Sequence, residues 1–128
     1  MEVEQNHTRG QLGGAIANEI VRILADFTGR GATRSRAFVH GDVVVCLFEE
    51  SMTRLEQSLV ANGKDDTVRQ LRDGSQRACE PEMVAAVERL TGREVVRFLS
   101  GSSTDADAGV EVFVLEPVTA NTDGLPPI

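Results

Sequence analysis

The longest unbroken apolar run of the chain, Val43 to Phe48, constrains the fold most strongly. Gly41 and Asp42 precede it, and glycine accepts the positive φ that opens a type II′ turn. The pattern therefore predicts a β-hairpin with strands at about 33–40 and 43–49. Both faces of the second strand are apolar, so either helices cover both faces or a partner covers one. For Leu47 in such a central strand, truncation to alanine is expected to cost about 2–5 kcal/mol.

A helix is predicted on each side of this hairpin. Apolar residues recur at helical spacing from Leu12 to Phe27, after a Thr8/Gln11 pair with the spacing of a capping box, and Gly29 can end this helix. Beyond the hairpin, the same capping-box spacing at Thr53 and Glu56 predicts a short helix that stops at Asn62 and Gly63.

A third helix is expected to begin at Asp65 and Asp66, which can cap its N-terminus and complement its dipole. Pro81 lacks an amide hydrogen, so the helix either kinks there or a new helix begins there. The residues expected on the inner face of these segments are Val68, Leu71, Ser75, Ala78, Val84, Ala85, Val87 and Leu90.

Two further strands complete the predicted fold, at about 94–99 and 110–115, joined by a polar and mobile loop at 100–109. The fold class is α+β, with the order α-β-β-α-α-α-β-β and a four-stranded, mostly antiparallel sheet of two β-hairpins backed by helices. We expect one domain at 8–117, a disordered N-terminus at 1–7 and a disordered tail at 118–128.

The composition and net charge of the chain argue against several classes of function. Hydrophobic residues make up 41% and charged residues 26% of 128, as in globular proteins, and no apolar run approaches the roughly 18 residues of a membrane span. The net charge of −7 argues against nucleic-acid binding. The first residues do not resemble an export signal, so the cytosol is expected. Cys46 and Cys79 read as buried small hydrophobes, and no motif for a metal, a cofactor or catalysis is present.

One stretch is a candidate binding site. Arg30, Thr33, Arg34 and Arg36 lie among glycines with no acid between them. Guanidinium groups match the oxygens of carboxylates and phosphates, so a small anion or an acidic partner could dock there. The alternative is a solvated strand entrance in which the arginines pair with Glu49, Glu50 or Glu111.

The run TGRGATRSRAFVHGDVVVCLFEESMTRLEQSLVANG, with VAAVERLTGREVV and VEVFVLEP, resembles the MpsC-type family over residues 9–117. That family is named after a component of a sodium-translocating, membrane-potential-generating system. The resemblance implies a non-enzymatic, cytosolic accessory or regulatory protein whose partners include membrane transport subunits, and it supplies no catalytic residues. Pro81 departs from the helix-compatible residue expected there. The apolar second face of 43–49 further predicts a homodimer or another protein contact. The alternative function is a small-anion or nucleotide-binding regulatory domain that uses Arg30 to Arg36.

Overall fold

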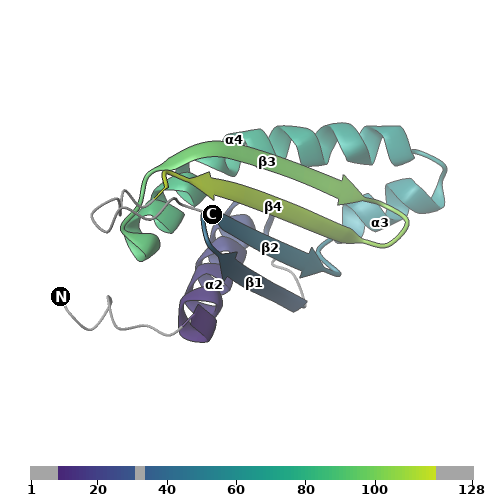
Figure 1. Cartoon of the computed structure of the whole chain (residues 1–128). Helices are drawn as coiled ribbons and strands as arrows, with labels where there is room; N and C mark the ends of the chain where they lie inside the picture. The colour runs from purple at the N-terminus through teal and green to yellow at the C-terminus, as the bar shows by residue number, and fades with distance from the viewer. Residues whose placement is uncertain (1–8, 31–33, 118–128) are drawn as a thin grey trace, which may run out of the picture.

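The computed structural model describes residues 9–30 and 34–117, and its elements follow the predicted α+β pattern. Thr8 and Thr33 lie outside the described residues, as do the two termini predicted to be disordered. The elements are α2 (Arg9–Thr28), β1 (Arg34–His40), β2 (Val43–Glu49), α3 (Arg54–Ala61), α4 (Asp65–Thr91), β3 (Val95–Ser103) and β4 (Ala108–Leu115). The strands form one antiparallel sheet in the order β1-β2-β4-β3 (Figure 1).

Both hairpins are present, but the second is longer than predicted. Gly41 has a φ of +59° in the β1–β2 turn, which confirms the glycine assignment there. In the second hairpin Ser100 to Ser103 and Ala108 continue the ladder, so the turn shrinks to 104–107. The prediction of a mobile loop at 100–109 is therefore wrong. Its polar side chains concealed the pairing, because an edge strand can be polar wherever it meets solvent.

The core lies between one face of the sheet and the two long helices. Branched and aromatic side chains from α2, α4, β2 and β4 fill it, because helical and strand periodicity bring their apolar positions together. Its members include Ile16, Ile20, Ile23, Val44, Cys46, Phe48, Cys79, Met83, Val87, Phe113 and Leu115. Gly13 allows α2 to approach β1 closely, since a Cβ there would collide with the carbonyl oxygen of Ala37.

Helix α4 differs from the expected helix in two respects. Its N-cap is Lys64, which makes no side-chain capping bond, so Asp65 and Asp66 lie inside the first turn, where their charge complements the helix dipole. The helix also continues through Pro81 to Thr91, so no separate helix begins at the proline. In Figure 1 it changes direction along its length, as a proline inside a helix permits.

The buried stripe of α4 is also rotated from the predicted one. Val68 and Val87 are buried as expected, but Leu71 is exposed and Gln76 is buried. Ala78 and Ala85 are exposed as well. The apolar pattern predicted only part of the inward stripe, because that stripe also carries the polar Gln76.

The short helix α3 is capped as predicted. The hydroxyl oxygen of Thr53 accepts a 3.1 Å hydrogen bond from the amide of Glu56, and the Glu56 carboxylate accepts a 2.8 Å bond from the amide of Thr53. These reciprocal bonds form the capping box. α3 nevertheless buries none of its side chains fully.

The repeated Thr-Gly-Arg ends of α2 and α4 have matching structures. Thr28 and Thr91 each donate a hydroxyl hydrogen bond to the carbonyl four residues earlier, at 2.9 and 2.7 Å. The following arginines then donate to backbone carbonyls: Arg30 to that of Glu50 at 2.8 Å, and Arg93 to that of Gly41 at 3.0 Å. Each long helix therefore leads into a hairpin in the same way.

Candidate functional site

None of the described helices lies over one face of the sheet. Cross-strand pairs point to the same side, so the register identifies the residues of each face. The side that carries Val44, Cys46 and Phe48 is buried under α2 and α4. The opposite side, here called the open face, is formed by these residues: Arg34, Arg36, Phe38 and His40; Val43, Val45, Leu47 and Glu49; Ala108, Val110, Val112 and Val114; Arg97, Leu99, Gly101 and Ser103.

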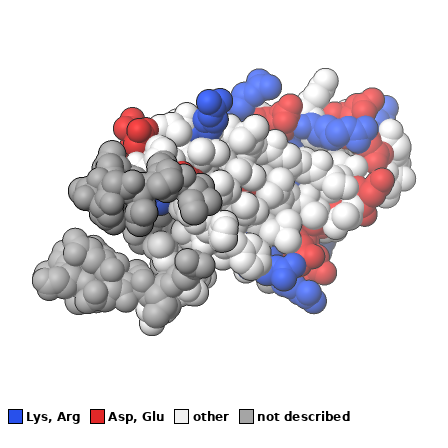
Figure 2. Space-filling model, viewed as in Figure 1, with Lys and Arg blue, Asp and Glu red and all other residues white. Residues whose placement is uncertain are grey.

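The open face is apolar at its centre and charged at its margin. One row crosses all four strands and consists of Phe38, Val45, Val112 and Leu99, in that order. Phe38 is 55% exposed and Leu99 is 57% exposed. The strands lie in front of α2 in Figure 1, and in the same view few charged side chains lie over them, while most gather around the edge (Figure 2).

The position of Leu47 contradicts its expected role. Leu47 belongs to the open face and is only partly buried, whereas its neighbour Phe48 is buried at 2% exposure. Helices cover one side of β2 rather than both. The loss of stability expected for truncation of a core residue therefore applies to Phe48 rather than to Leu47. Leu47 lies on the face that a partner could cover.

The predicted arginine site is divided by the structure. Arg34 and Arg36 lie on the margin of the open face, and Arg34 reaches the Glu49 carboxylate at 4.0 Å. Arg30 lies elsewhere, at the end of α2, where its guanidinium donates to the carbonyl oxygen of Glu50. The Arg34–Glu49 pair agrees with the solvated strand entrance, and Glu111 makes no such pair because it is buried on the other face.

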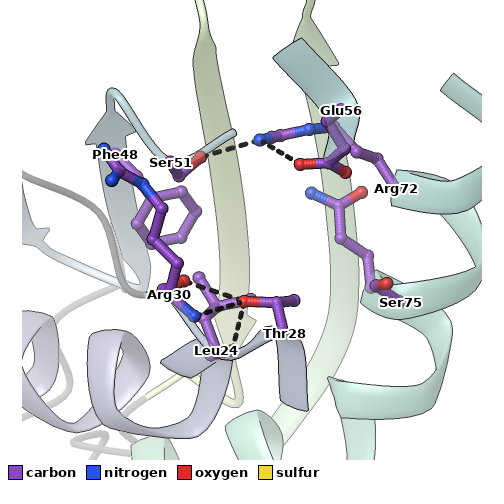
Figure 3. A pocket seen from close by; sticks show the side chains of 9 residues that line it. Leu24, Thr28, Arg30, Phe48, Ser51, Glu56, Arg72 and Ser75 are labelled. Atoms are coloured by element: carbon purple, nitrogen blue, oxygen red, sulfur yellow. Dashed lines mark hydrogen bonds and ion pairs between the residues drawn. The ribbon is translucent and has the colours of Figure 1, made fainter. Parts of the chain in front are cut away.

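Arg30 lines a small cavity between α2 and α4 (Figure 3). The cavity has a volume of about 40 Å³, and Arg72 lines it from the α4 side. The Arg72 guanidinium donates to the hydroxyl oxygen of Ser51 at 3.0 Å and lies 3.6 Å from the Glu56 carboxylate. Arg72 lies 42 positions after Arg30 in the sequence, so the spacing of the arginines does not indicate that the two line one cavity.

Asp107 fixes the backbone of the segment that precedes α3, which lies beside this cavity. Its carboxylate accepts hydrogen bonds from the amides of Ser51 and Met52, both at 3.0 Å, and lies 3.8 Å from Arg72. Asp107 itself has a φ of +49°, in the left-handed region. It orders the chain ahead of α3 from the turn of the second hairpin.

A buried carboxyl group lies between α4 and the sheet. Glu111 is fully buried, and one of its carboxyl oxygens accepts a 3.2 Å hydrogen bond from the side-chain amide of Gln76. The other, Oε1, has no hydrogen-bond partner within residues 9–30 and 34–117. Burial raises the pKa of Glu111 to about 8, so the group is largely protonated at neutral pH. Sequence reasoning treated Glu111 as a surface acid that could pair with the arginines, because a charged residue in a strand is ordinarily exposed.

The two thiols are buried as predicted. Burial raises the pKa of Cys46 to about 12 and that of Cys79 to about 11. Both are therefore thiols rather than thiolates at neutral pH, and they act as apolar core groups.

These features define a class of protein: a small α+β protein whose sheet is covered by helices on one face and open on the other. Within the described ranges, none of the helices is both long enough and apolar enough to cross a membrane. The family model described as the Na+-translocating membrane potential-generating system (MpsC) matches residues 8–117, and the chain belongs to this family. No protein with a curated description and no solved structure matches it.

Proposed function

We propose that this chain is a non-enzymatic accessory protein of the sodium-translocating system for which its family is named, and that it acts through protein–protein contact. The observation that carries this proposal is the open face of the sheet. Monomeric proteins rarely leave a continuous apolar patch of this kind exposed, and such patches mark interaction surfaces. The raised pKa values of both thiols also make them unsuited to nucleophilic catalysis.

The proposed place of action is the cytosolic side of the membrane, beside the transport subunits. A sodium-translocating system needs membrane-spanning components, and the described helices of this chain supply none. The chain would therefore reach the membrane through its partners rather than through a span of its own.

A pull-down from detergent-solubilised membranes tests this function. The tagged protein is expected to retain membrane transport subunits that an unrelated tagged domain does not retain. The Leu99→Lys variant shows whether the open face takes part, and Leu55→Lys is its matched control, because Leu55 is similarly exposed (64%) but lies on α3. Recovery of no membrane subunit by folded wild-type protein would contradict the proposal.

The second candidate function is a small-anion or nucleotide-binding regulatory domain, and the cavity between Arg30 and Arg72 favours it. Guanidinium groups on two sides of the cavity can hold an oxyanion. The Glu56 carboxylate beside Arg72 would repel such an anion and weaken its binding. A thermal-shift screen with phosphate, bicarbonate and nucleotides tests this function. Arg30→Gln should abolish any stabilisation, whereas Arg34→Gln, on the open face, should preserve it. Absence of stabilisation by every anion would contradict this candidate.

A further inference from the structure

The open face can cover itself, because one of its rows is apolar at every strand. Phe38, Val45, Val112 and Leu99 follow one another across β1, β2, β4 and β3. A two-fold axis parallel to the strands and placed between β2 and β4 sets this row against the same row of a second copy. Phe38 then meets Leu99 of the second copy, and Val45 meets Val112. Apolar side chains cover apolar side chains at all four positions.

The two rows on one side of this apolar row match in size under the same axis. Arg36 lies opposite Gly101 of the second copy, and Arg34 lies opposite Ser103. Gly101 and Ser103 line a hollow of roughly 240 Å³ together with Leu47, Ala108 and Val110. The apolar stem of an arginine can occupy such a hollow while its charged head stays near water.

The charges of the open face also permit this pairing. The axis keeps Arg34 and Arg36 away from the same residues of the second copy, since β1 meets β3 rather than β1. Under this axis the basic residues meet at one kind of position, where His40 of one copy faces Arg97 of the other. Both residues belong to the last row at one end of the sheet. Solvent and salt screen charges at such a rim.

We propose that a second copy of this chain covers the open face, and that the two sheets stack about a two-fold axis parallel to their strands. This inference goes beyond the proposed function, because it assigns the open face to a second copy of the chain rather than to a transport subunit. A contact with the membrane subunits is then made by the dimer through its remaining surfaces.

The area of the open face is sufficient for a modest dimer. Four strands about 4.8 Å apart, each seven to nine residues long, present a face of roughly 19 Å by 25 Å. Two such faces together cover on the order of 900–1,000 Å², which lies near the lower bound for specific protein interfaces. We therefore expect association in the micromolar range rather than an obligate dimer.

Sedimentation equilibrium of the purified chain measures this association directly. Wild-type protein is expected to dimerise at micromolar concentrations. The double variant Phe38→Ser/Leu99→Ser should raise the dissociation constant at least a hundredfold. Its matched control is Phe27→Ser/Leu55→Ser, which replaces residues of the same types and similar exposure on α2 and α3. The control should dimerise like wild type, and circular dichroism verifies that each variant is folded.

Cross-linking tests the orientation of the axis without weakening the core. In the double variant Arg36→Cys/Gly101→Cys, which keeps the apolar row intact, a short bismaleimide should link the two copies efficiently, because residue 36 of one lies against residue 101 of the other. Each single variant should link poorly, since its two thiols lie about 14 Å apart across the sheet, three strand spacings. The native Cys46 and Cys79 are buried and should not react. An axis across the strands would bring β1 against β1, and the Arg36→Cys single variant would then link.

The possible outcomes separate this inference from the proposed function. A wild-type chain that stays monomeric at several hundred micromolar overturns the dimer, as does a Phe38→Ser/Leu99→Ser variant that dimerises like wild type. Efficient linking in the single variant overturns the axis. If the monomer retains transport subunits through the open face in the pull-down, the dimer is wrong while the accessory function stands.

Discussion

At the scale of single residues, Glu111 is the group whose chemistry is most altered by the fold. Burial raises its pKa to about 8, well above the ordinary value of 4.5 that it regains on unfolding. Between these values the folded chain holds a proton that the unfolded chain has lost. The free energy of unfolding therefore falls as pH rises from about 4.5 to about 8.

Glu111→Gln should remove this pH dependence. Glutamine is uncharged, and its carbonyl oxygen can accept the hydrogen bond that Gln76 donates. We expect the variant to exceed wild type in stability by on the order of a few kcal/mol at pH 9, and by much less at pH 5. Chemical denaturation at the two pH values measures the difference. The control Glu116→Gln changes an exposed acid and should show no such trend, and an equal effect of Glu111→Gln at both pH values would contradict the buried, protonated state.

At the scale of elements, the approach of α2 to β1 depends on one of two adjacent glycines. Gly13 is buried against the carbonyl oxygen of Ala37, whereas a Cβ on Gly14 would meet nothing within 4 Å. Gly13→Ala should destabilise the fold by about 1–3 kcal/mol, because the helix must shift away from the strand. Gly14→Ala should stabilise it by about 0.4–1 kcal/mol, since alanine restricts the unfolded chain. Urea unfolding of both variants compares the two, and a stabilising Gly13→Ala would show that α2 does not press on β1.

The elements also show which parts of the fold follow from local patterns. The hairpin at Gly41 and the Thr53/Glu56 cap were predictable because a single backbone angle and two side-chain bonds define them. The extension of β3 to Ser103 was not predictable. Its polar residues pair through backbone hydrogen bonds, and these produce no alternation of apolar and polar residues in the sequence. The buried stripe of α4 escaped for a related reason, since Gln76 faces inward to meet Glu111.

The candidate site was less predictable than the fold because its parts come from distant positions. Arg30 and Arg36 are close in the sequence, yet they lie on different surfaces. The second guanidinium of the cavity comes from Arg72 on α4. The apolar second side of 43–49 did indicate that the sheet has two apolar faces, but only the packed structure shows which face the helices leave open.

At the scale of the whole molecule, the described helices all pack on one side of the sheet, and this asymmetry can be measured on β2. Phe48 points into the core and Leu47 points to the open face. At submicromolar concentration, Phe48→Ala should cost about 3–5 kcal/mol of unfolding free energy through lost burial and a cavity. Leu47→Ala should then cost about 1 kcal/mol or less, as at a surface site.

The same pair of variants links this asymmetry to self-association. Dimerisation stabilises the folded chain by mass action, so the unfolding free energy of wild type should rise with protein concentration. Leu47→Ala removes apolar contact from the open face and should lose part of that increment, so its cost grows as the concentration rises. The cost of Phe48→Ala should stay nearly constant, because its side chain is covered by the helices of its own copy. Denaturant unfolding over a hundredfold range of concentration separates the two, and a concentration-independent cost of Leu47→Ala would mean that no second copy covers β2.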